Sequence, residues 1–228
     1  DAEGAAVNPS IQMDADEFFM QLFEQLEGAL KETPQADLLK KLFQGQMVMQ
    51  MLNKDTKQKY SERLETWFTI SIDIKSKKSV LDALDHFFEG EVLDGDNKYK
   101  TEEGEYVEAI KRSCVHTLPP VLILHLKRFE FDFDLMKKFK INDHCEFPAT
   151  IKMHKYTASF IEQQERAGAA AEGDASLGGP DADSESPSDD EYKLVGVLVH
   201  SGTSDSGHYY SFVKERQAGP IDGGESST

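Results

Sequence analysis

Residues 192–214 (YKLVGVLVHSGTSDSGHYYSFVK) contain an almost unbroken hydrophobic run, a loop of small residues and an aromatic run in direct succession. The hydrophobic run from Leu194 to Val199 is typical of a strand that is covered on both faces. Residues 201–207 contain only Ser, Gly, Thr and Asp and predict a loop, whereas residues 208–213 predict a returning strand. The segment is therefore expected to form a β-hairpin.

His208 lies at the junction between this loop and the returning strand. Because side chains alternate along a strand, His208 is expected to share a face with Tyr210 and Phe212. Gly207 has no side chain, so the backbone of an extended substrate could approach the imidazole here. A single histidine in such a position more often simply begins a hairpin, and a catalytic interpretation needs support from other segments.

The first part of the chain predicts helices, and strands dominate later. Apolar residues at spacings of three and four predict a helix that ends at Thr33-Pro34, and residues 37–43 predict a short second helix closed by Gly45. Alternation predicts a half-buried strand over residues 68–74, whereas residues 46–59 show no clear period. The remaining predicted elements are a helix over 81–88 stopped by Gly90, strands at 107–113 and 121–129, and a short strand near Ile151. This order indicates an α+β fold.

Acidic residues are concentrated in residues 162–191, which contain ten Asp or Glu and a single Arg. About half of the chain's net charge of −17 lies in this segment, where large apolar side chains are almost absent. Such a composition cannot bury enough surface to offset the entropy of ordering, so the segment is predicted to be a disordered insertion and a solvated spacer. Two alternatives stay open: a phosphorylation segment around Ser184, Ser186 and Ser188, or a docking site for a basic partner.

Charge and cysteine content narrow the classes of function. The acidity outside the insertion disfavours nucleic acid and favours a basic protein partner. There is no apolar run of membrane-spanning length and no signal peptide, so no membrane partner is expected. Two cysteines, Cys114 and Cys145, cannot build a disulfide framework, and a reducing compartment, the cytosol or the nucleus, is therefore expected.

Residues 207–212 (GHYYSF), preceded by VHSG, resemble the histidine box of the ubiquitin-specific proteases, papain-like cysteine enzymes that cleave after the C-terminal glycine of ubiquitin. Residues 12–18 (QMDADEF) resemble the family's Q-x-D-A-x-E-F box, and residues 118–129 (LPPVLILHLKRF) resemble its LPP-x-L-x-L-x-LKRF strand. A spaced pattern of the fingers region is matched between them by Glu91, Leu93, Gly95, Asn97 and Tyr99. Matches in this order are highly specific, and LVGVLVHSG further resembles the fat facets-like branch.

The resemblance implies a right-hand architecture with a helical thumb, β fingers and a β palm, of which this chain contains an incomplete set. The implied organisation is a partial helical thumb at 1–45, a fingers region without zinc ligands at 46–117, palm strands at 118–161, the acidic disordered insertion at 162–191, the active-site hairpin of the palm at 192–216 and a flexible tail at 217–228. It also implies that ubiquitin is held by the fingers, that its tail passes between thumb and palm, and that ubiquitinated proteins are the substrates.

The resemblance identifies His208 as the catalytic general base and acid. A cysteine thiol with a pKa of about 8.5 is mostly protonated at neutral pH, so an imidazole must accept its proton and later protonate the leaving amine. The family's nucleophilic cysteine precedes the Q-x-D-A box, and this chain is therefore expected to be a piece of a longer protein that supplies it. Cys114 and Cys145 match no catalytic motif and are predicted to be buried or incidental thiols. The Asp or Asn that orients the family's histidine is not assigned to any residue.

Four residues match family positions that line the channel for the ubiquitin tail. Gln12 and Asp14 lie at the start of the first predicted helix, where a carboxylate could bind substrate backbone or arginine; a simple capping Asp is the alternative. His200 is expected to shape the channel and Tyr209 to pack on the glycine pair of the tail. Both could instead finish a strand with satisfied hydrogen bonds.

Many family members bind zinc at the fingertips through two C-x-x-C pairs. Here Thr101 and Gly104 stand where the second pair is expected, and residues 46–65 contain no cysteine. Because that site requires thiolate ligands, no metal and no cofactor are expected. The fingertips are then held by strand pairing alone, or are looser.

Three functions stay open at this point. The leading one is a thiol-dependent ubiquitin hydrolase, of which this chain is most of the catalytic domain. The second is a catalytically inactive relative that binds ubiquitin as an interaction module, and the third is a scaffold that has kept only the fold. An N-x-G-N-T-C-[YF]-like box upstream of Asp1 would favour the hydrolase.

Overall fold

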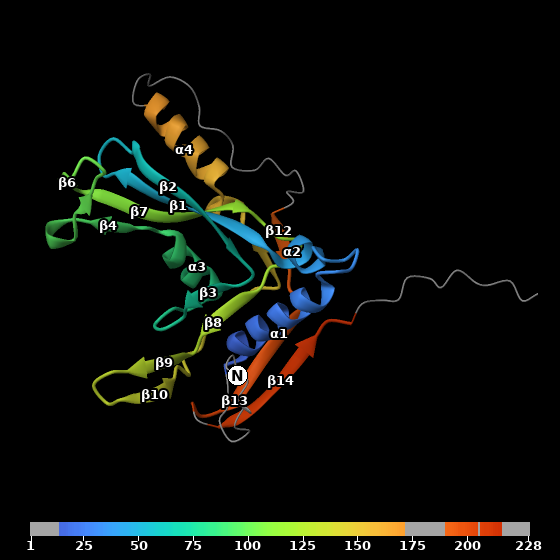
Figure 1. Ribbon diagram of the computed structural model, residues 1–228. Helices are drawn as coiled ribbons and strands as arrows, with labels where there is room; N and C mark the ends of the chain where they lie inside the picture. The colour runs from blue at the N-terminus through green and yellow to red at the C-terminus, as the bar shows by residue number, and fades with distance from the viewer. Residues whose placement is uncertain (1–13, 172–189, 205, 216–228) are drawn as a thin grey trace, which may run out of the picture.

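The computed structural model describes residues 14–171, 190–204 and 206–215. Figure 1 shows one lobe built on a four-stranded sheet and a second lobe that contains α1 (Ala15–Leu30) and the hairpin of β13 (Gly196–Gly202) and β14 (Gly207–Val213). The mixture of helices and mainly antiparallel sheets confirms the predicted α+β class. None of the helices in the described part of the chain is long and apolar enough to cross a membrane.

The two predicted N-terminal helices are present as α1 and α2 (Leu38–Phe43). The side chain of Asp14 caps α1 by accepting a hydrogen bond from the backbone N–H of Asp16 at 2.9 Å, which satisfies one donor of the first turn. Phe23 anchors the inner face of α1. Its ring contacts three other aromatic rings, those of Phe19, Phe43 and Phe68.

The four-stranded antiparallel sheet has the strand order β2-β1-β7-β4. Its strands are β1 (Gly45–Asn53), β2 (Lys59–Trp67), β4 (Glu91–Leu93) and β7 (Ala109–Thr117). β1 lies in the segment that shows no clear period. It is a central strand with buried or half-buried residues throughout, so its sequence does not alternate between apolar and polar.

The main core lies beside this sheet, around α3 (Val80–Phe88) and the parallel strands β3 (Ile70–Asp73) and β8 (Leu124–Lys127). A capping box begins α3, in which Ser79 and Asp82 exchange hydrogen bonds between side chain and backbone. Alternation in β3 buries Ile70 and Ile72, which confirms the predicted half-buried strand. The parallel pair fixes the position of β8 and of the side chains that β8 carries towards α1.

Shorter elements complete the fold. They are η1 (Gly95–Asn97), β5 (Tyr99–Lys100), β6 (Tyr106–Val107), β9 (Phe129–Asp132), β10 (Lys137–Lys140), β11 (Thr150–Lys152), η2 (His154–Tyr156) and β12 (Glu191–Lys193). Thr101 and Gly104 lie in the turn between β5 and β6. Backbone hydrogen bonds close this turn, from N of Thr101 to O of Glu105 at 2.8 Å and from N of Gly104 to O of Thr101 at 3.0 Å.

The predicted disorder of residues 162–191 is wrong for Glu191, which begins β12, and for residues 162–171, which belong to α4 (Ala158–Ala171). Two effects order them. Ala, Gln, Glu and Arg are strong helix formers, and two acidic side chains are neutralised by the sheet, Glu162 by Lys59 at 2.8 Å and Glu165 by Arg112 at 2.6 Å. Residues 172–189 and the predicted tail at 217–228 lie outside the described residues.

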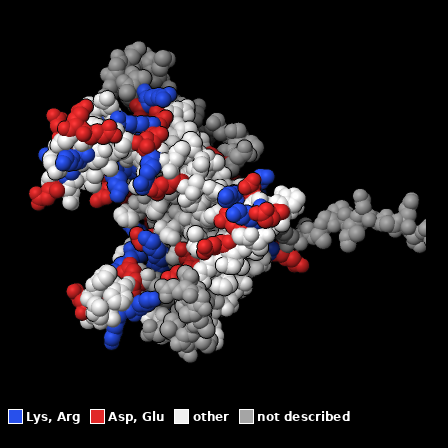
Figure 2. All heavy atoms as spheres, in the orientation of Figure 1, with Lys and Arg blue, Asp and Glu red and all other residues white. Residues whose placement is uncertain are grey.

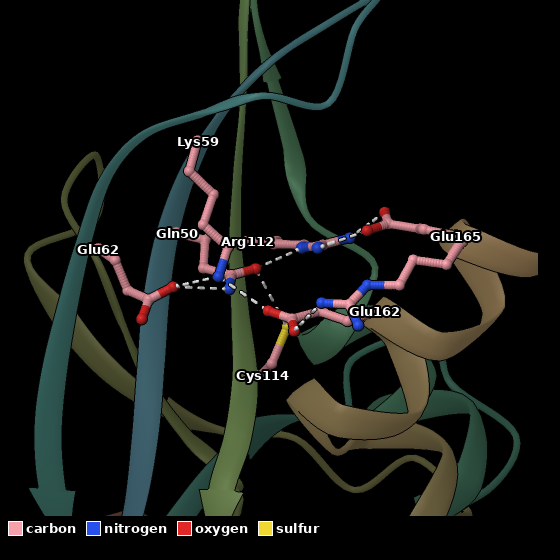
Figure 3. Close-up of polar contacts among 8 residues, drawn as sticks. Gln50, Lys59, Glu62, Arg112, Cys114, Glu162 and Glu165 are labelled. Carbon is pink, nitrogen blue, oxygen red and sulfur yellow. Dashed lines mark hydrogen bonds and ion pairs between the residues drawn. The ribbon is translucent and has the colours of Figure 1, made fainter. Parts of the chain in front are cut away.

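Polar contacts fix α4 on the sheet, on the side away from α3 (Figure 1). The side chain of Gln50 is only 2% exposed; it donates to Glu62 at 3.0 Å and accepts from Nε of Arg112 at 2.9 Å. Arg112 in turn donates hydrogen bonds from both terminal nitrogens to the carboxylate of Glu165 (Figure 3). A buried network therefore connects the middle of β1 with the helix.

The predicted hairpin forms, and β13 and β14 pair in register from Gly196–Val213 to Gly202–Gly207. Its first strand is not covered on both faces as predicted, because Leu198 is 58% exposed, and Val195, directly before the strand, is 53% exposed. The two strands form a sheet of their own, so fewer elements pack against them than against a strand inside a larger sheet.

Candidate active site

The N-terminus of α1 faces the start of β14. A backbone hydrogen bond joins Ala15 to the side chain of Tyr209, so the first turn of the helix and the hairpin are in contact. A cleft of about 200 Å³ opens beside this contact. Its lining residues are Asp14, Glu17, Phe129, Glu130, Phe131, Lys138, Ser204 and Tyr209.

Asp14 caps α1 and also lines the cleft, so the capping alternative is confirmed without excluding a second role. Its Oδ1 lies 3.5 Å from Nε2 of His125 on β8. The polar contact with His125 lowers the pKa of Asp14; burial opposes this effect, and the hydrogen bond from Asp16 adds to it. A carboxylate that is ionised at neutral pH therefore stands at the edge of the cleft. Gln12 lies outside the described residues.

His200 and Tyr209 are cross-strand partners, and their side chains lie on the same face of the hairpin. Their ring centroids are 4.8 Å apart, and the ring of Phe129 packs against His200 at 5.2 Å. Burial and the charge of Lys140 lower the pKa of His200, which favours the neutral imidazole. Burial raises the pKa of Tyr209, which keeps the hydroxyl protonated. The two side chains form an uncharged wall next to Asp14.

His208 pairs with Ser201 and projects from the face of the hairpin opposite to that of His200 and Tyr209. It is exposed, and the exposed residues Tyr210 and Phe212 share its face, as the alternation predicts. The cleft lining includes the next residue of β14, Tyr209, but not His208 itself. The imidazole therefore stands beside the cleft, on the outer side of the strand.

Gly207 is required by its neighbours in the hairpin. A Cβ at this position would lie 2.5 Å from Nε2 of His200 and would also overlap the carbonyl oxygen of Ser201. The space above Gly207 that was expected to admit a substrate backbone is thus occupied by His200, and that prediction is wrong. The glycine instead allows the imidazole of His200 to approach β14 closely.

His125 is a site residue that the sequence motifs did not single out. Its Nδ1 lies 3.0 Å from Oγ of Ser71 on β3 and 3.8 Å from Oδ2 of Asp16. The contact with Asp14 raises the pKa of His125; burial opposes this effect, and the charge of Asp16 adds to it. The available signal was a titratable residue in the otherwise apolar run LILHL.

Both cysteines are buried free thiols, as predicted. Burial raises the pKa of Cys114 and also that of Cys145. A buried thiol with a raised pKa is mostly protonated at neutral pH and is a poor nucleophile. Neither cysteine lines the cleft, so the structure assigns them no part in its chemistry.

A sequence model of the family described as "Ubiquitin carboxyl-terminal hydrolase" matches residues 3–220. Ubiquitin carboxyl-terminal hydrolase 9X of Mus musculus is 35% identical over 217 residues, which cover 95% of this chain and 8% of that protein. Ubiquitin carboxyl-terminal hydrolase 24 of Homo sapiens is 37% identical over 210 residues, 90% of this chain and 8% of that protein. The probable ubiquitin carboxyl-terminal hydrolase FAF of Drosophila melanogaster is 35% identical over 211 residues, 92% of this chain and 7% of that protein.

Solved structures give the same result. The SAGA Ubp8/Sgf11/Sus1/Sgf73 DUB module bound to ubiquitin aldehyde has a TM-score of 0.69 at 25% identity, over 91% of this chain and 43% of that chain. A structure of the module bound to monoubiquitin has a TM-score of 0.68 at 28% identity, over 90% of this chain and 41% of that chain. The chain spans less than a tenth of the length of these sequence relatives. The resemblance to ubiquitin-specific proteases and to the fat facets-like branch is confirmed, and the chain belongs to the ubiquitin carboxyl-terminal hydrolase family.

Proposed function

We propose that the protein to which this chain contributes is a cysteine-type ubiquitin hydrolase, and that the cleft beside Asp14 and Tyr209 binds the C-terminal tail of ubiquitin. One observation carries the proposal: the Q-x-D-A motif at the start of α1 and the histidine motif at the start of β14, far apart in sequence, line the same cleft. Family membership supports the reaction, which is cleavage of the peptide or isopeptide bond after the last glycine of ubiquitin in ubiquitinated proteins.

The cleft suits an extended basic peptide. The carboxylate of Asp14 accepts hydrogen bonds from the backbone of the tail, and that of Glu17 attracts its arginines, whereas Glu130 is already paired with Lys75 at 2.7 Å. Tyr209 packs on the glycine pair, which has no side chain to hinder the contact, and Phe129 provides an apolar wall. Figure 2 shows a hollow between the lobe of the four-stranded sheet and that of β9 and β10, which leaves room for the globular body of ubiquitin.

His208 supplies the proton transfers in this proposal. Its imidazole accepts the proton of a nucleophilic cysteine that lies outside this chain, and the thiolate attacks the carbonyl carbon of the last glycine. The protonated imidazole then gives its proton to the leaving amine, and water hydrolyses the resulting thioester with His208 acting again as base. His208 directly precedes Tyr209 in β14 but projects from the opposite face of the strand, so the proposal requires the cysteine to approach the imidazole from that outer side.

The tail channel is tested by ubiquitin binding to the full-length protein, measured by calorimetry with intact ubiquitin and with ubiquitin that lacks its last two glycines and the preceding arginine. Asp14→Asn should weaken the binding of intact ubiquitin about tenfold and leave the truncated form almost unaffected. Asp37→Asn is the matched control, because Asp37 is the exposed N-cap residue of α2 and makes no side-chain capping bond. If Asp14→Asn weakens the binding of both ubiquitin forms equally, the tail does not bind in this cleft.

Hydrolysis itself is tested with ubiquitin that carries a fluorogenic C-terminal amide. Release of the fluorophore by the wild-type protein supports the hydrolase, whereas tight binding without release would identify an inactive ubiquitin-binding relative.

The acidic composition and the buried free thiols support a location in the cytosol or nucleus and a protein partner in place of nucleic acid or membrane. Localisation of the tagged full-length protein tests this part.

A further inference from the structure

His125 lies where the palm strands meet the first turn of α1. In the parallel pair of β3 and β8 it is in register with Ser71, whose Oγ is 3.0 Å from Nδ1 of the imidazole. Towards the start of α1, Nε2 is 3.5 Å from Oδ1 of Asp14, and Nδ1 is also 3.8 Å from Oδ2 of Asp16. The side chain is 23% exposed. One ring therefore bridges a rigid strand and the helix start that lines the cleft.

Acidic groups dominate the surroundings of this ring. From α1, Asp14 and Asp16 face it, and from its own strand Lys127 contributes a positive charge. The charge of Lys127 is itself paired, because its Nζ lies 3.2 Å from Oδ1 of Asp73 on β3. On the far side of Asp14, Lys138 of β10 acts on the carboxylate. The balance favours the imidazolium form of His125, since two carboxylates outweigh one lysine that is already neutralised.

We infer that protonated His125 is a positioning residue for the ubiquitin-tail channel: it ties the capping carboxylate of Asp14 to strand β8, and loss of its proton releases this tie. The inference rests on the proposed function of the cleft. Within the described residues, the side chain of Asp14 is also held by the capping bond from Asp16, which uses the same oxygen, Oδ1, as the contact with His125. The contact with His125 therefore helps to set the orientation of the other oxygen of Asp14, Oδ2, towards the cleft and the tail.

The contact between His125 and Asp14 should weaken as the pH rises. Contact with Asp14 raises the folded-state pKa of His125 above its ordinary value of 6.5. The tie is therefore complete below that ordinary pKa and is lost as the pH rises through the folded-state pKa. Binding of the tail should weaken over the same range. The chemical step does not pass through His125, so KM should change and kcat should not.

Steady-state hydrolysis of a ubiquitin C-terminal fluorogenic amide by the full-length protein, between pH 6 and pH 9, tests the inference. His125→Gln keeps a group that can bond Ser71 but cannot be charged. It should raise KM about three- to tenfold at pH 6, flatten the rise of KM with pH and leave kcat within about twofold. Asp16→Asn should keep the rise of KM but move it to lower pH, because one of the charges that favours the imidazolium is removed.

Lys127→Gln is the matched control, since it lies two residues away on the same face of the same strand and touches the cleft neither directly nor through Asp14. It should retain the rise of KM with pH and move it to higher pH, opposite to Asp16→Asn, because the charge of Lys127 disfavours the imidazolium form of His125. If the wild-type protein hydrolyses the substrate and His125→Gln shows the same dependence of KM on pH, the inference about His125 is wrong. The proposed function is unaffected by that result. A parallel fall of kcat in His125→Gln, with the pH dependence of KM retained, would make His125 merely structural. Absence of both hydrolysis and ubiquitin binding in the wild type would instead overturn the proposed function.

Discussion

Arg112 on β7 donates hydrogen bonds from both terminal nitrogens to the carboxylate of Glu165 on α4, at 2.6 and 3.0 Å. The same guanidinium donates from Nε to the buried amide of Gln50. The side chain of Arg112 is only 12% exposed and that of Glu165 is 36% exposed, so the guanidinium end of this ion pair is shielded from water. The helix that begins the acidic insertion is thus fixed to the fingers region by a semi-buried charge pair.

Replacing Arg112 by Ala should lower the free energy of opening of α4 by about 2–4 kcal/mol, because it leaves Glu165 and the oxygen of Gln50 without their partner. Hydrogen–deuterium exchange of the α4 peptides in the full-length protein measures this opening. Arg63→Ala is the control, since Arg63 pairs with Glu65 on the surface and is 72% exposed; its effect should stay below about 0.5 kcal/mol. Equal exchange in both variants would mean that α4 is held by other contacts.

Acid should release α4 before the core unfolds. The hydrogen bond from Lys59 lowers the pKa of Glu162 and also that of Glu62 below the ordinary value of 4.5. Groups with a lowered pKa stabilise the fold above the ordinary pKa, and this stabilisation is lost as the pH falls through the folded-state pKa. The loss is therefore expected below about pH 4.5.

Cys114 reports this release, because its thiol is buried within the same polar network (Figure 3). A disulfide reagent that reacts in acid should modify Cys114 as the pH falls from 5 to 3.5, while Cys145, in the main core, is modified only on global unfolding. Mass spectrometry of the modified peptides identifies the site. Simultaneous modification of both cysteines would show that α4 and the core unfold together.

Gly207→Ala should disturb the cleft. The added methyl group would overlap His200 and the carbonyl of Ser201, so His200 and its partner Tyr209 must move. A rise in KM for ubiquitin substrates of roughly tenfold is expected from such a displacement. Gly28→Ala is the matched glycine variant: no atom lies within 4 Å of the added Cβ, and it should stabilise α1 by about 0.5–1 kcal/mol without changing KM. Similar kinetics of the two variants would contradict the close packing at Gly207.

The two cysteines should not react with a ubiquitin derivative that carries a C-terminal electrophile. Both thiols are buried, and burial raises the pKa of each. In the full-length protein, peptide mapping should find the covalent adduct on a cysteine outside this chain. Stoichiometric labelling of Cys114 or Cys145 would reverse their assignment as structural thiols.

Local patterns predicted the elements with a single buried face. The capping Asp14, the apolar spacing of α1, and the alternation of β3 each depend on neighbours within one helix or strand, so the sequence was sufficient. It failed where contacts distant in sequence decide the structure. α4 was predicted as disordered because its stabilising partners, Lys59 and Arg112, lie about a hundred and about fifty residues upstream.

The same limit applies to the candidate site. Motifs identified Asp14 and Tyr209, and the structure brings both to one cleft. His125 was overlooked because its significance comes from the packing of β8 against α1, which no periodicity reports. The exposure of Leu198 was also missed, since a hydrophobic run looks the same in a strand with two covered faces and in an isolated hairpin.

The most direct test of the central claim is His208→Ala in the full-length protein, with hydrolysis of a ubiquitin C-terminal amide and ubiquitin affinity measured on the same preparation. We expect a loss of turnover of roughly 10²–10⁴-fold with an affinity within about threefold of the wild type. Retained turnover, or an equal loss of turnover and affinity, would contradict the assignment of the imidazole as the proton carrier.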